Sequence, residues 1–253
     1  MTRGDSFAKY AHDHYPDVEI GMMLCGGTAY AATINPEDVM ATMRHNQMEL
    51  FYSDVLLRGK IPGYAYRFFD ENGFNIDISD NELDALNNTC DFFSFSYYYN
   101  EVCDKKSFEN GNDTYRNKNL PMNDWGWCLD PIGLRQLLNL FYDRYQCPIY
   151  ITENGMGMKD TVIEGKIHDD YRIPFYKQHI EQIKEAIYDG VDLRGYYAWA
   201  PLDIVSCSSS EMSKRYGFIY VDLDDYGNGT GRRIIKDSYY WYQKVIETNG
   251  EQL

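Results

Sequence analysis

The sequence is short of cations and has no long apolar run, and both shortages exclude classes of function. Its 24 Lys and Arg stand against 39 Asp and Glu, a net charge of −15. A polyanion is attracted neither to nucleic acid nor to an anionic membrane. No apolar run approaches the roughly 18 residues that a spanning helix needs, and no basic, apolar leader opens the chain. We therefore expect a soluble, cytoplasmic protein that binds neither nucleic acid nor a membrane.

The cysteines and glycines form none of the familiar metal or nucleotide motifs. The six cysteines are scattered without a C-x-x-C pair, at Cys25, Cys90, Cys103, Cys128, Cys147 and Cys207. In a chain of this size they indicate reduced core thiols rather than a disulfide framework or a zinc site. Gly26-Gly27 has no phosphate-loop continuation. The sequence therefore implies no metal and no organic cofactor.

Strand-like and helix-like segments alternate along the chain. With 253 residues, 44% of them apolar, it can bury a large core as one domain over residues 1–253. We expect strands at about 18–25, 90–96, 148–152 and 193–199. We expect helices at about 35–56, 131–145, 170–190 and 236–248. This α/β pattern predicts a parallel sheet, either half of an eight-stranded barrel or a small open sheet.

Two connections differ from the short turns expected between such units. The segment from about 97 to 130 is long and aromatic, without clear periodicity. Connections of that length are uncommon and are usually functional. The polar stretch after residue 199 leads into residues 217–222, which resemble a hairpin.

The hexapeptide from Tyr150 to Gly155 is the most informative stretch. An apolar run that starts at Pro148 ends in Glu153, and Asn154-Gly155 follows as a strong turn signal. Glu153 is therefore expected at the carboxyl end of a buried strand. In a parallel α/β barrel that end carries the catalytic groups, although a solvated Glu would fit the hexapeptide equally well.

Several further motifs occur in order along the chain. They are Asn35-Pro-Glu-Asp-Val39, Asp54-Val-Leu-Leu-Arg-Gly59, Asp91-Phe-Phe-Ser-Phe-Ser-Tyr-Tyr98, Asp124-Trp-Gly-Trp127, Asp130-Pro-Ile-Gly-Leu-Arg135 and Lys214-Arg-Tyr-Gly-Phe-Ile-Tyr-Val-Asp222. Together with the hexapeptide they resemble glycoside hydrolase family 1, and among its members the bacterial 6-phospho-β-glucosidases. The resemblance implies a (β/α)8 TIM barrel and makes the four strands its strands five to eight, the C-terminal half.

The same resemblance implies that something is missing. The family's second catalytic carboxylate, a Glu in a Thr-x-Asn-Glu motif, belongs to the first half of the barrel, and no such motif occurs here. We therefore expect a C-terminal fragment, a truncated product or one half of a split protein. A half-barrel exposes two sheet edges, so we expect it to self-associate or to pair with the missing N-terminal half.

The resemblance also assigns catalytic roles. It makes Glu153 the nucleophile of a retaining glycosidase and Tyr98 the tyrosine that donates a hydrogen bond to it. Ser96 stands where the family commonly has Asn. Glu101, Asp124 and Asp203 lie near the expected strand ends and could replace the missing acid. None of the three lies in the family's acid/base motif, and for each a solvated or structural role is the simpler interpretation.

Aromatic residues suit the sugar itself. Sugar faces are apolar and stack on indole. The resemblance places Trp199 at the floor of the site, and Trp125 and Trp127 on the side of the leaving group. Trp125 and Trp127 could instead simply anchor their loop.

The loop after Trp199 carries the specificity argument. Enzymes of the family that act on unphosphorylated sugars usually have Glu-Trp seven and eight residues after this Trp, where this chain has Ser206-Cys207. Losing an anion and gaining hydroxyls and an ammonium suits a sugar 6-phosphate. The resemblance therefore implies a phosphate clamp of Ser208, Lys214 and Tyr216, with Ser206 as the alternative serine.

Together these features predict a retaining hydrolase of 6-phospho-β-glucosides. An inactive fragment or split half that only binds a sugar phosphate or a partner is the alternative, because the acid is missing. A 6-phospho-β-galactosidase would use the same clamp, and that alternative stays open as well.

Overall fold

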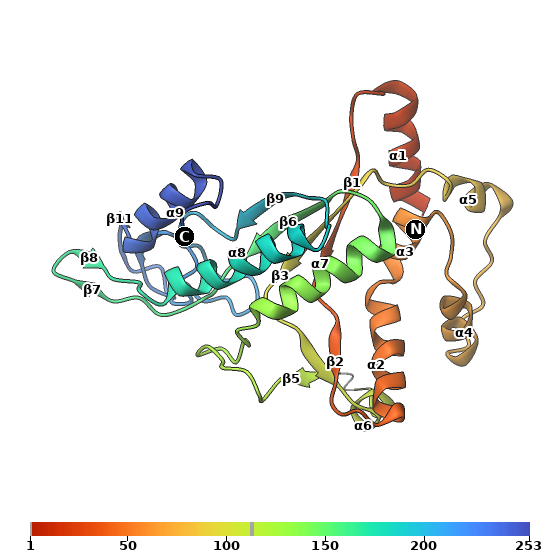
Figure 1. Ribbon diagram of the computed structural model, residues 1–253, viewed down its shortest axis with the longest axis horizontal. Helices are drawn as coiled ribbons and strands as arrows, with labels where there is room; N and C mark the ends of the chain where they lie inside the picture. The colour runs from red at the N-terminus through yellow and green to blue at the C-terminus, as the bar shows by residue number, and fades with distance from the viewer. Residues whose placement is uncertain (1, 112–113) are drawn as a thin grey trace.

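The computed structural model describes residues 2–111 and 114–253, with the backbone alone for residues 2–6 (Figure 1). The helices described are α1 (Thr2–His14), α2 (Pro36–Glu49), α3 (Phe51–Arg58), α4 (Gly63–Glu71), α5 (Asp80–Ala85), α6 (Lys105–Glu109), α7 (Pro131–Tyr145), α8 (Arg172–Tyr188) and α9 (Asp237–Glu247). The strands described are β1 (Gly21–Cys25), β2 (Ala29–Ala31), β3 (Phe92–Tyr97), β4 (Glu101–Cys103), β5 (Tyr115–Arg116), β6 (Ile149–Asn154), β7 (Val162–Ile163), β8 (Lys166–Ile167), β9 (Leu193–Ala198), β10 (Ile219–Leu223) and β11 (Gly229–Ile235). The predicted domain 1–253 therefore includes three residues, 1, 112 and 113, that lie outside the described part.

A four-stranded parallel sheet forms the centre of the fold. Its order, β1-β3-β6-β9, follows the chain, and each neighbouring pair is parallel. The helices α7 and α8 lie side by side across one face of it (Figure 1). Four parallel strands joined by helices are half of an eight-stranded barrel, so the predicted partial α/β barrel is confirmed.

The main core lies between this sheet and its helices. The rings of Phe93 and Phe95 on β3 meet Phe141 of α7 edge to face, with centroids 4.8 and 5.0 Å apart. All three side chains are fully buried, and burying each contributes on the order of 1.5–3 kcal/mol to folding. The helix α7 has the bounds the sequence predicts, because Asp130 caps it and Pro131 begins it.

The expected single helix over residues 35–56 is wrong. It breaks at Leu50, whose φ of −91° and ψ of 4° end α2 and begin α3. Leu50 belongs to the main core and Phe51 to a second cluster around Val55. Successive residues of a straight helix point about 100° apart, so the break lets both side chains enter their own cores.

The expected loop over residues 97–130 is only partly irregular. It contains β4, α6 and β5, and the small sheet β2-β4-β5 forms there. These elements have 3, 5 and 2 residues, too short to show a periodicity in sequence. The predicted hairpin near residues 217–222 is confirmed as the antiparallel pair β10-β11.

The prediction of core thiols is confirmed for Cys103 and Cys128, which are 0% and 1% exposed. It is wrong for Cys25 and Cys207, which are exposed. Cys25 is the last residue of β1, and Cys207 lies in the loop after β9. Both positions lie beyond the helices that cover the sheet.

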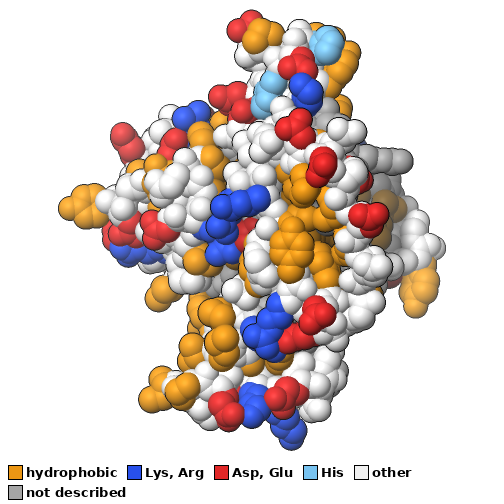
Figure 2. Space-filling view, turned by 90° about the vertical axis from the view of Figure 1, so that its right-hand side faces the viewer, with side chains coloured by type: hydrophobic (Ala, Val, Ile, Leu, Met, Phe, Trp, Pro, Cys, Tyr) orange, Lys and Arg blue, Asp and Glu red, His pale blue; other side chains and the backbone are white. Residues whose placement is uncertain are grey.

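The two edges of the sheet, β1 and β9, remain unpaired on their outer sides among the described residues. A groove of about 590 Å³ runs along β1 between Phe7, Tyr52 and Leu56, and it includes the half-exposed Met23. Figure 2 shows hydrophobic side chains gathered in the middle of this end of the molecule. A second groove of about 420 Å³ follows β9, between α8 and α9.

Candidate active site

Glu153 lies near the carboxyl end of β6, where the sequence predicts it. The hydroxyl of Tyr98, just after the neighbouring β3, donates a hydrogen bond to Glu153 Oε2 over 2.8 Å. Burial and this carboxylate raise the pKa of Tyr98 far above its ordinary value, so the phenol keeps its proton and acts as a donor. A hydrogen bond of this kind stabilises an ionised carboxylate.

Asn154 belongs to the strand rather than to a turn, contrary to the prediction. Its Nδ2 donates to the Tyr97 carbonyl over 2.8 Å, and its Oδ1 accepts from the Tyr196 hydroxyl over 2.7 Å. One buried amide thus joins β6 to both neighbouring strands. Next to it, a Cβ at Gly155 would lie 3.2 Å from that of Trp199, so a glycine lets Trp199 approach the end of β6.

Lys214 is a buried ammonium beside these strand ends. It is 1% exposed, and its Nζ lies 3.7 Å from the centroid of the Trp127 ring and 3.4 Å from Ser208 Oγ. Among the described residues it forms no ion pair with a carboxylate. Burial therefore lowers its pKa. A Cβ at Gly157 would lie 2.6 Å from Lys214 Cγ, so the chain after β6 leaves room for the lysine.

The other predicted clamp residues surround Lys214. Ser206 Oγ lies 3.3 Å from Ser208 Oγ and 3.4 Å from the Tyr216 hydroxyl. Ser206 and Tyr216 are 2% and 3% exposed, and burial raises the pKa of Tyr216. Both serines thus belong to one cluster with the ammonium and the phenol. Three hydroxyls and a cation together form a receptor for an anion.

The two predicted sugar-binding tryptophans occupy different positions. Trp199 follows β9, and its backbone N–H donates to the Asn154 carbonyl over 2.8 Å, so it lies beside the end of β6. Trp125 lies over the clamp, and its Nε1–H donates to Glu211 over 2.8 Å. Sequence reasoning missed Glu211, because one acidic residue in a serine-rich loop carries no signal of its own.

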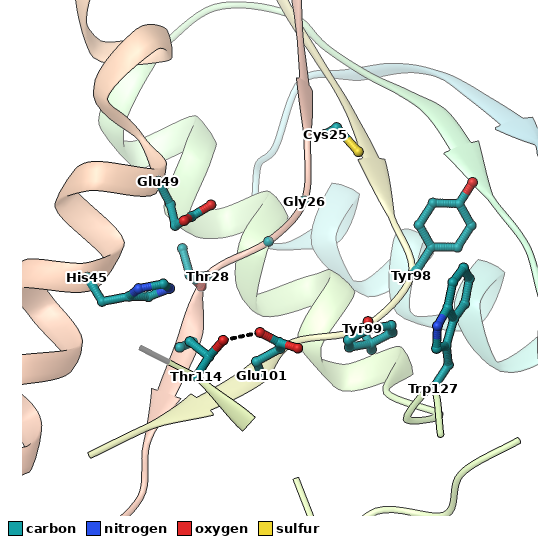
Figure 3. A pocket seen from close by; sticks show the side chains of 12 residues that line it. Cys25, Gly26, Thr28, His45, Glu49, Tyr98, Tyr99, Glu101, Thr114 and Trp127 are labelled. Carbon is teal, nitrogen blue, oxygen red and sulfur yellow. Dashed lines mark hydrogen bonds between the residues drawn. The ribbon is translucent and has the colours of Figure 1, made fainter. Parts of the chain in front are cut away.

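A pocket of about 310 Å³ is lined in part by Tyr98, the hydrogen-bond partner of Glu153 (Figure 3). Tyr98 and Trp127 form one wall, with ring centroids 5.0 Å apart, and Trp127 therefore contacts both the clamp and the tyrosine. Glu49 and Glu101 lie opposite these rings in Figure 3. Glu101 accepts hydrogen bonds from Thr114 and Arg116, so it is already engaged.

The remaining candidate replacements for the missing acid lie in unsuitable places. Asp203 is buried against Lys236, 2.8 Å away, and Asp124 is exposed on its loop. The hydrogen bond recorded for the Glu153 carboxylate within the described residues comes from Tyr98. A retaining glycosidase uses two carboxylates, and none of the three candidates weighed above is paired with Glu153 in the described residues.

The described residues lack a metal cluster and a membrane-spanning helix. They contain no group of three or more His, Cys, Asp or Glu side chains placed to hold a metal ion. In the same part of the chain, no helix combines the length and the apolarity that crossing a membrane requires.

A parallel half-barrel with a glutamate and its tyrosine donor at the strand ends is the architecture of a glycosidase. Comparison with known proteins agrees: the chain belongs to glycosyl hydrolase family 1, whose family model matches residues 3–251. It also resembles the family 1 β-glucosidase of Thermotoga maritima, with a TM-score of 0.84 and 30% identity over 97% of this chain and 54% of that one.

Curated relatives are more similar in sequence. A phospho-cellobiase of Klebsiella oxytoca is 49% identical over 97% of this chain. A 6-phospho-β-glucosidase of Dickeya chrysanthemi is 48% identical, and an aryl-phospho-β-D-glucosidase of Bacillus subtilis 47%. In each case the chain spans about half, 54%, of the relative's own length.

Proposed function

We propose that this chain carries the nucleophile and the phosphate clamp of a retaining glycosidase that acts on 6-phospho-β-glucosides. The observation that carries the proposal is Lys214. A buried ammonium needs an anion. Among the described residues Lys214 contacts hydroxyls and aromatic rings, and no carboxylate lies within ion-pair distance, although the charge of Glu211 acts on it from farther away. A phosphate dianion would fill that place. The relatives named as phosphoglucosidases support the same substrate class.

The chemistry follows from the position of Glu153. Its carboxylate would attack the anomeric carbon, form a glycosyl-enzyme bond and expel the leaving-group oxygen, and water would then release the sugar. The hydrogen bond from Tyr98 orients the carboxylate for that attack. With the 6-phosphate on Lys214, the ring would lie over Trp199 and the leaving group in the pocket beside Trp127.

Expelling an ordinary sugar or alcohol also requires a general acid. No candidate carboxylate among Glu101, Asp124 and Asp203 is placed for that role. This observation favours a second function, in which the chain alone binds a sugar phosphate without cleaving a natural substrate. An activated leaving group separates the two functions, because it departs without protonation.

We also infer that the sheet is completed by further polypeptide. Both edges are parallel strands with apolar grooves beside them, and an open edge of this kind pairs readily. The missing half of the barrel and a second copy of this chain both remain as partners. Light scattering on the purified chain distinguishes a monomer from a dimer.

The proposed reaction is tested by phenolate release from a nitrophenyl 6-phospho-β-glucoside. We expect the chain to turn over this substrate, and Glu153→Gln to lose at least about 10³-fold in rate. Glu181→Gln is the matched control, because Glu181 is exposed on the outer helix α8. Equal rates for the chain and Glu153→Gln would refute the assignment of the nucleophile.

A further inference from the structure

We propose that Arg172 is a positioning residue for the phosphate clamp, acting through the backbone of the clamp and not on the ligand. This inference rests on the proposed function, because it assumes that Lys214 binds a phosphate. It concerns a group of buried charges behind the clamp, which neither the nucleophile nor the clamp residues include.

Six charged side chains form this group, and all are nearly inaccessible to solvent. Three are basic and three acidic: Arg172, Arg215, Lys236, Asp160, Asp169 and Asp203, each between 0% and 6% exposed in its side chain. Lys236 Nζ lies 2.5 Å from Asp160 and 2.8 Å from Asp203. Arg172 Nε lies 2.9 Å from Asp169. The group is therefore neutral as a whole, and a proton moving from Lys236 to Asp203 would not change that sum.

The neutrality of this group matters for the clamp next to it. Lys214 is adjacent in sequence to Arg215 but forms no ion pair with a carboxylate of the group. The three acids and three bases form ion pairs with one another, and none of these acids is paired with Lys214. Burial of so many charges is costly unless each is paired and hydrogen-bonded, which suggests a role beyond stability.

The guanidinium of Arg172 holds the clamp in position by donating hydrogen bonds to three backbone carbonyls. Nη1 donates to the Met156 carbonyl over 3.0 Å and to the Tyr216 carbonyl over 2.7 Å, and Nη2 donates to the Arg215 carbonyl over 3.2 Å. Met156 is three residues after Glu153. Tyr216 belongs to the clamp, and Arg215 lies between the clamp residues Lys214 and Tyr216. One side chain thus fixes the clamp against the segment that follows the nucleophile strand.

The other end of the clamp is fixed by the same group. Asp203 Oδ1 accepts from the Gly217 N–H over 2.9 Å, next to Tyr216. A Cβ at Gly217 would lie 2.3 Å from the Leu202 carbonyl carbon, so the two backbones are in close contact. Met158 and Arg215 also exchange backbone hydrogen bonds of 3.0 and 2.9 Å. The backbone on both sides of Tyr216 is therefore held before any ligand arrives.

Lysine cannot replace Arg172 in this role. An ammonium keeps the charge but lacks the planar fork that reaches three carbonyls. Without the fork, the segment from Lys214 to Tyr216 would lose the hydrogen bonds that join its carbonyls to Arg172 and would be held less firmly relative to Glu153. Small displacements of positioned groups cost binding and rate together.

The test is the dissociation constant of glucose 6-phosphate, measured by calorimetry on the 253-residue chain, with inorganic phosphate as a second probe. We expect Arg172→Lys to weaken both by at least about tenfold, and to leave the much weaker binding of unphosphorylated glucose unchanged. Arg135→Lys is the matched control, because Arg135 forms an exposed ion pair with Asp189 on the outer helices, and should bind as the unaltered chain does. A folded Arg172→Lys with unchanged phosphate affinity would overturn the positioning role.

A milder variant covers the case in which Arg172→Lys does not fold. Tyr171→Phe removes only the hydroxyl that accepts from Arg172 Nη2 over 2.9 Å and donates to Asp160. We expect a loss of about two- to fourfold in phosphate affinity, and no loss would contradict the proposal. If the unaltered chain binds neither probe, the proposed function fails and this inference fails with it. If binding is lost in Lys214→Met but not in the Arg172 or Tyr171 variants, only the inference fails.

Discussion

The two sides of the sheet, the one at β6 and β9 and the one at β1, differ in what they hold. Beside β6 and β9 lie Glu153, its partner Tyr98, the proposed clamp and a neutral group of buried charges. Beside β1, the edge strand is unpaired within the described residues, and half-exposed apolar side chains such as Met23 line its groove. We call the first the finished flank, because it holds the proposed binding site within this chain, although the outer edge of β9 is itself unpaired. We call the second the open flank, because it offers an uncovered edge strand and no such site.

This contrast separates binding from bond cleavage. The proposed phosphate receptor and the proposed nucleophile belong to the finished flank and depend on contacts within this chain. A general acid is needed as well, and Glu101, Asp124 and Asp203, the candidates weighed in this chain, are not placed for that role. Binding should therefore survive in the chain alone, and cleavage of unactivated substrates should not.

The largest expected effect comes from covering the open flank. Mixing the chain with the matching N-terminal half of the Klebsiella relative should raise hydrolysis of a 6-phospho-disaccharide by roughly 10²–10⁴-fold, the usual contribution of a general acid. Release of glucose 6-phosphate measures it. Met23→Asp places a charge in the β1 groove and should abolish the gain, whereas the same change at the exposed Tyr226, far along the chain in the β10-β11 turn, should not. A gain in hydrolysis that survives Met23→Asp would show that the added half does not bind along the β1 edge.

Acid should weaken the finished flank first. His179 of α8 is buried, and its Nε2 has no hydrogen-bond partner, so burial lowers its pKa from 6.5 to about 4. As pH falls from 6.5, the unfolded chain takes up this proton before the folded one does, and stability drops until about pH 4. The loss amounts to about 3 kcal/mol.

Urea unfolding at two pH values checks this expectation. Between neutral pH and about pH 4, His179→Leu should lose roughly 3 kcal/mol less stability than the unaltered chain does. His14→Leu, at an exposed position on α1, serves as the control. If both variants follow the unaltered chain, His179 is not responsible for the acid sensitivity.

The smallest expected effect concerns Glu211, which binds Trp125 and adds a negative charge near the clamp. Glu211→Gln keeps an acceptor for the indole but removes the charge that repels a phosphate. We expect glucose 6-phosphate to bind about two- to threefold more tightly, with the gain shrinking as salt is added. Weaker binding would mean that the carboxylate matters mainly for orienting Trp125.

Local signals in the sequence were enough for the sheet and for α7. Pro131 and Asp130 mark the start of α7, and the apolar run before Glu153 marks β6. The resemblance to the family supplied the pairing of Tyr98 with Glu153 and the members of the clamp, which the structure brings together. The sequence analysis did not anticipate α1, α4 and α5.

The features that sequence reasoning missed depend on contacts between distant residues. The local sequence predicts a turn at Asn154. Hydrogen bonds to β3 and β9 hold it in the strand instead. The local sequence predicts that Leu50 lies inside a helix. In the structure the helix breaks there, because Leu50 packs into one core and Phe51 into another. The buried charges gather from residues 160 to 236, and nothing local distinguishes Arg172 from a surface arginine.

The central claim is that the finished flank recognises a phosphate without help from the rest of a barrel. Calorimetry with glucose 6-phosphate and with glucose, on the chain and on Lys214→Met, tests it most directly. We expect a preference for the phosphorylated sugar of about 10–100-fold, the value of one charge-assisted contact, and its loss in Lys214→Met. Equal affinities for the two sugars in the folded chain, or a preference that persists in Lys214→Met, would contradict the account.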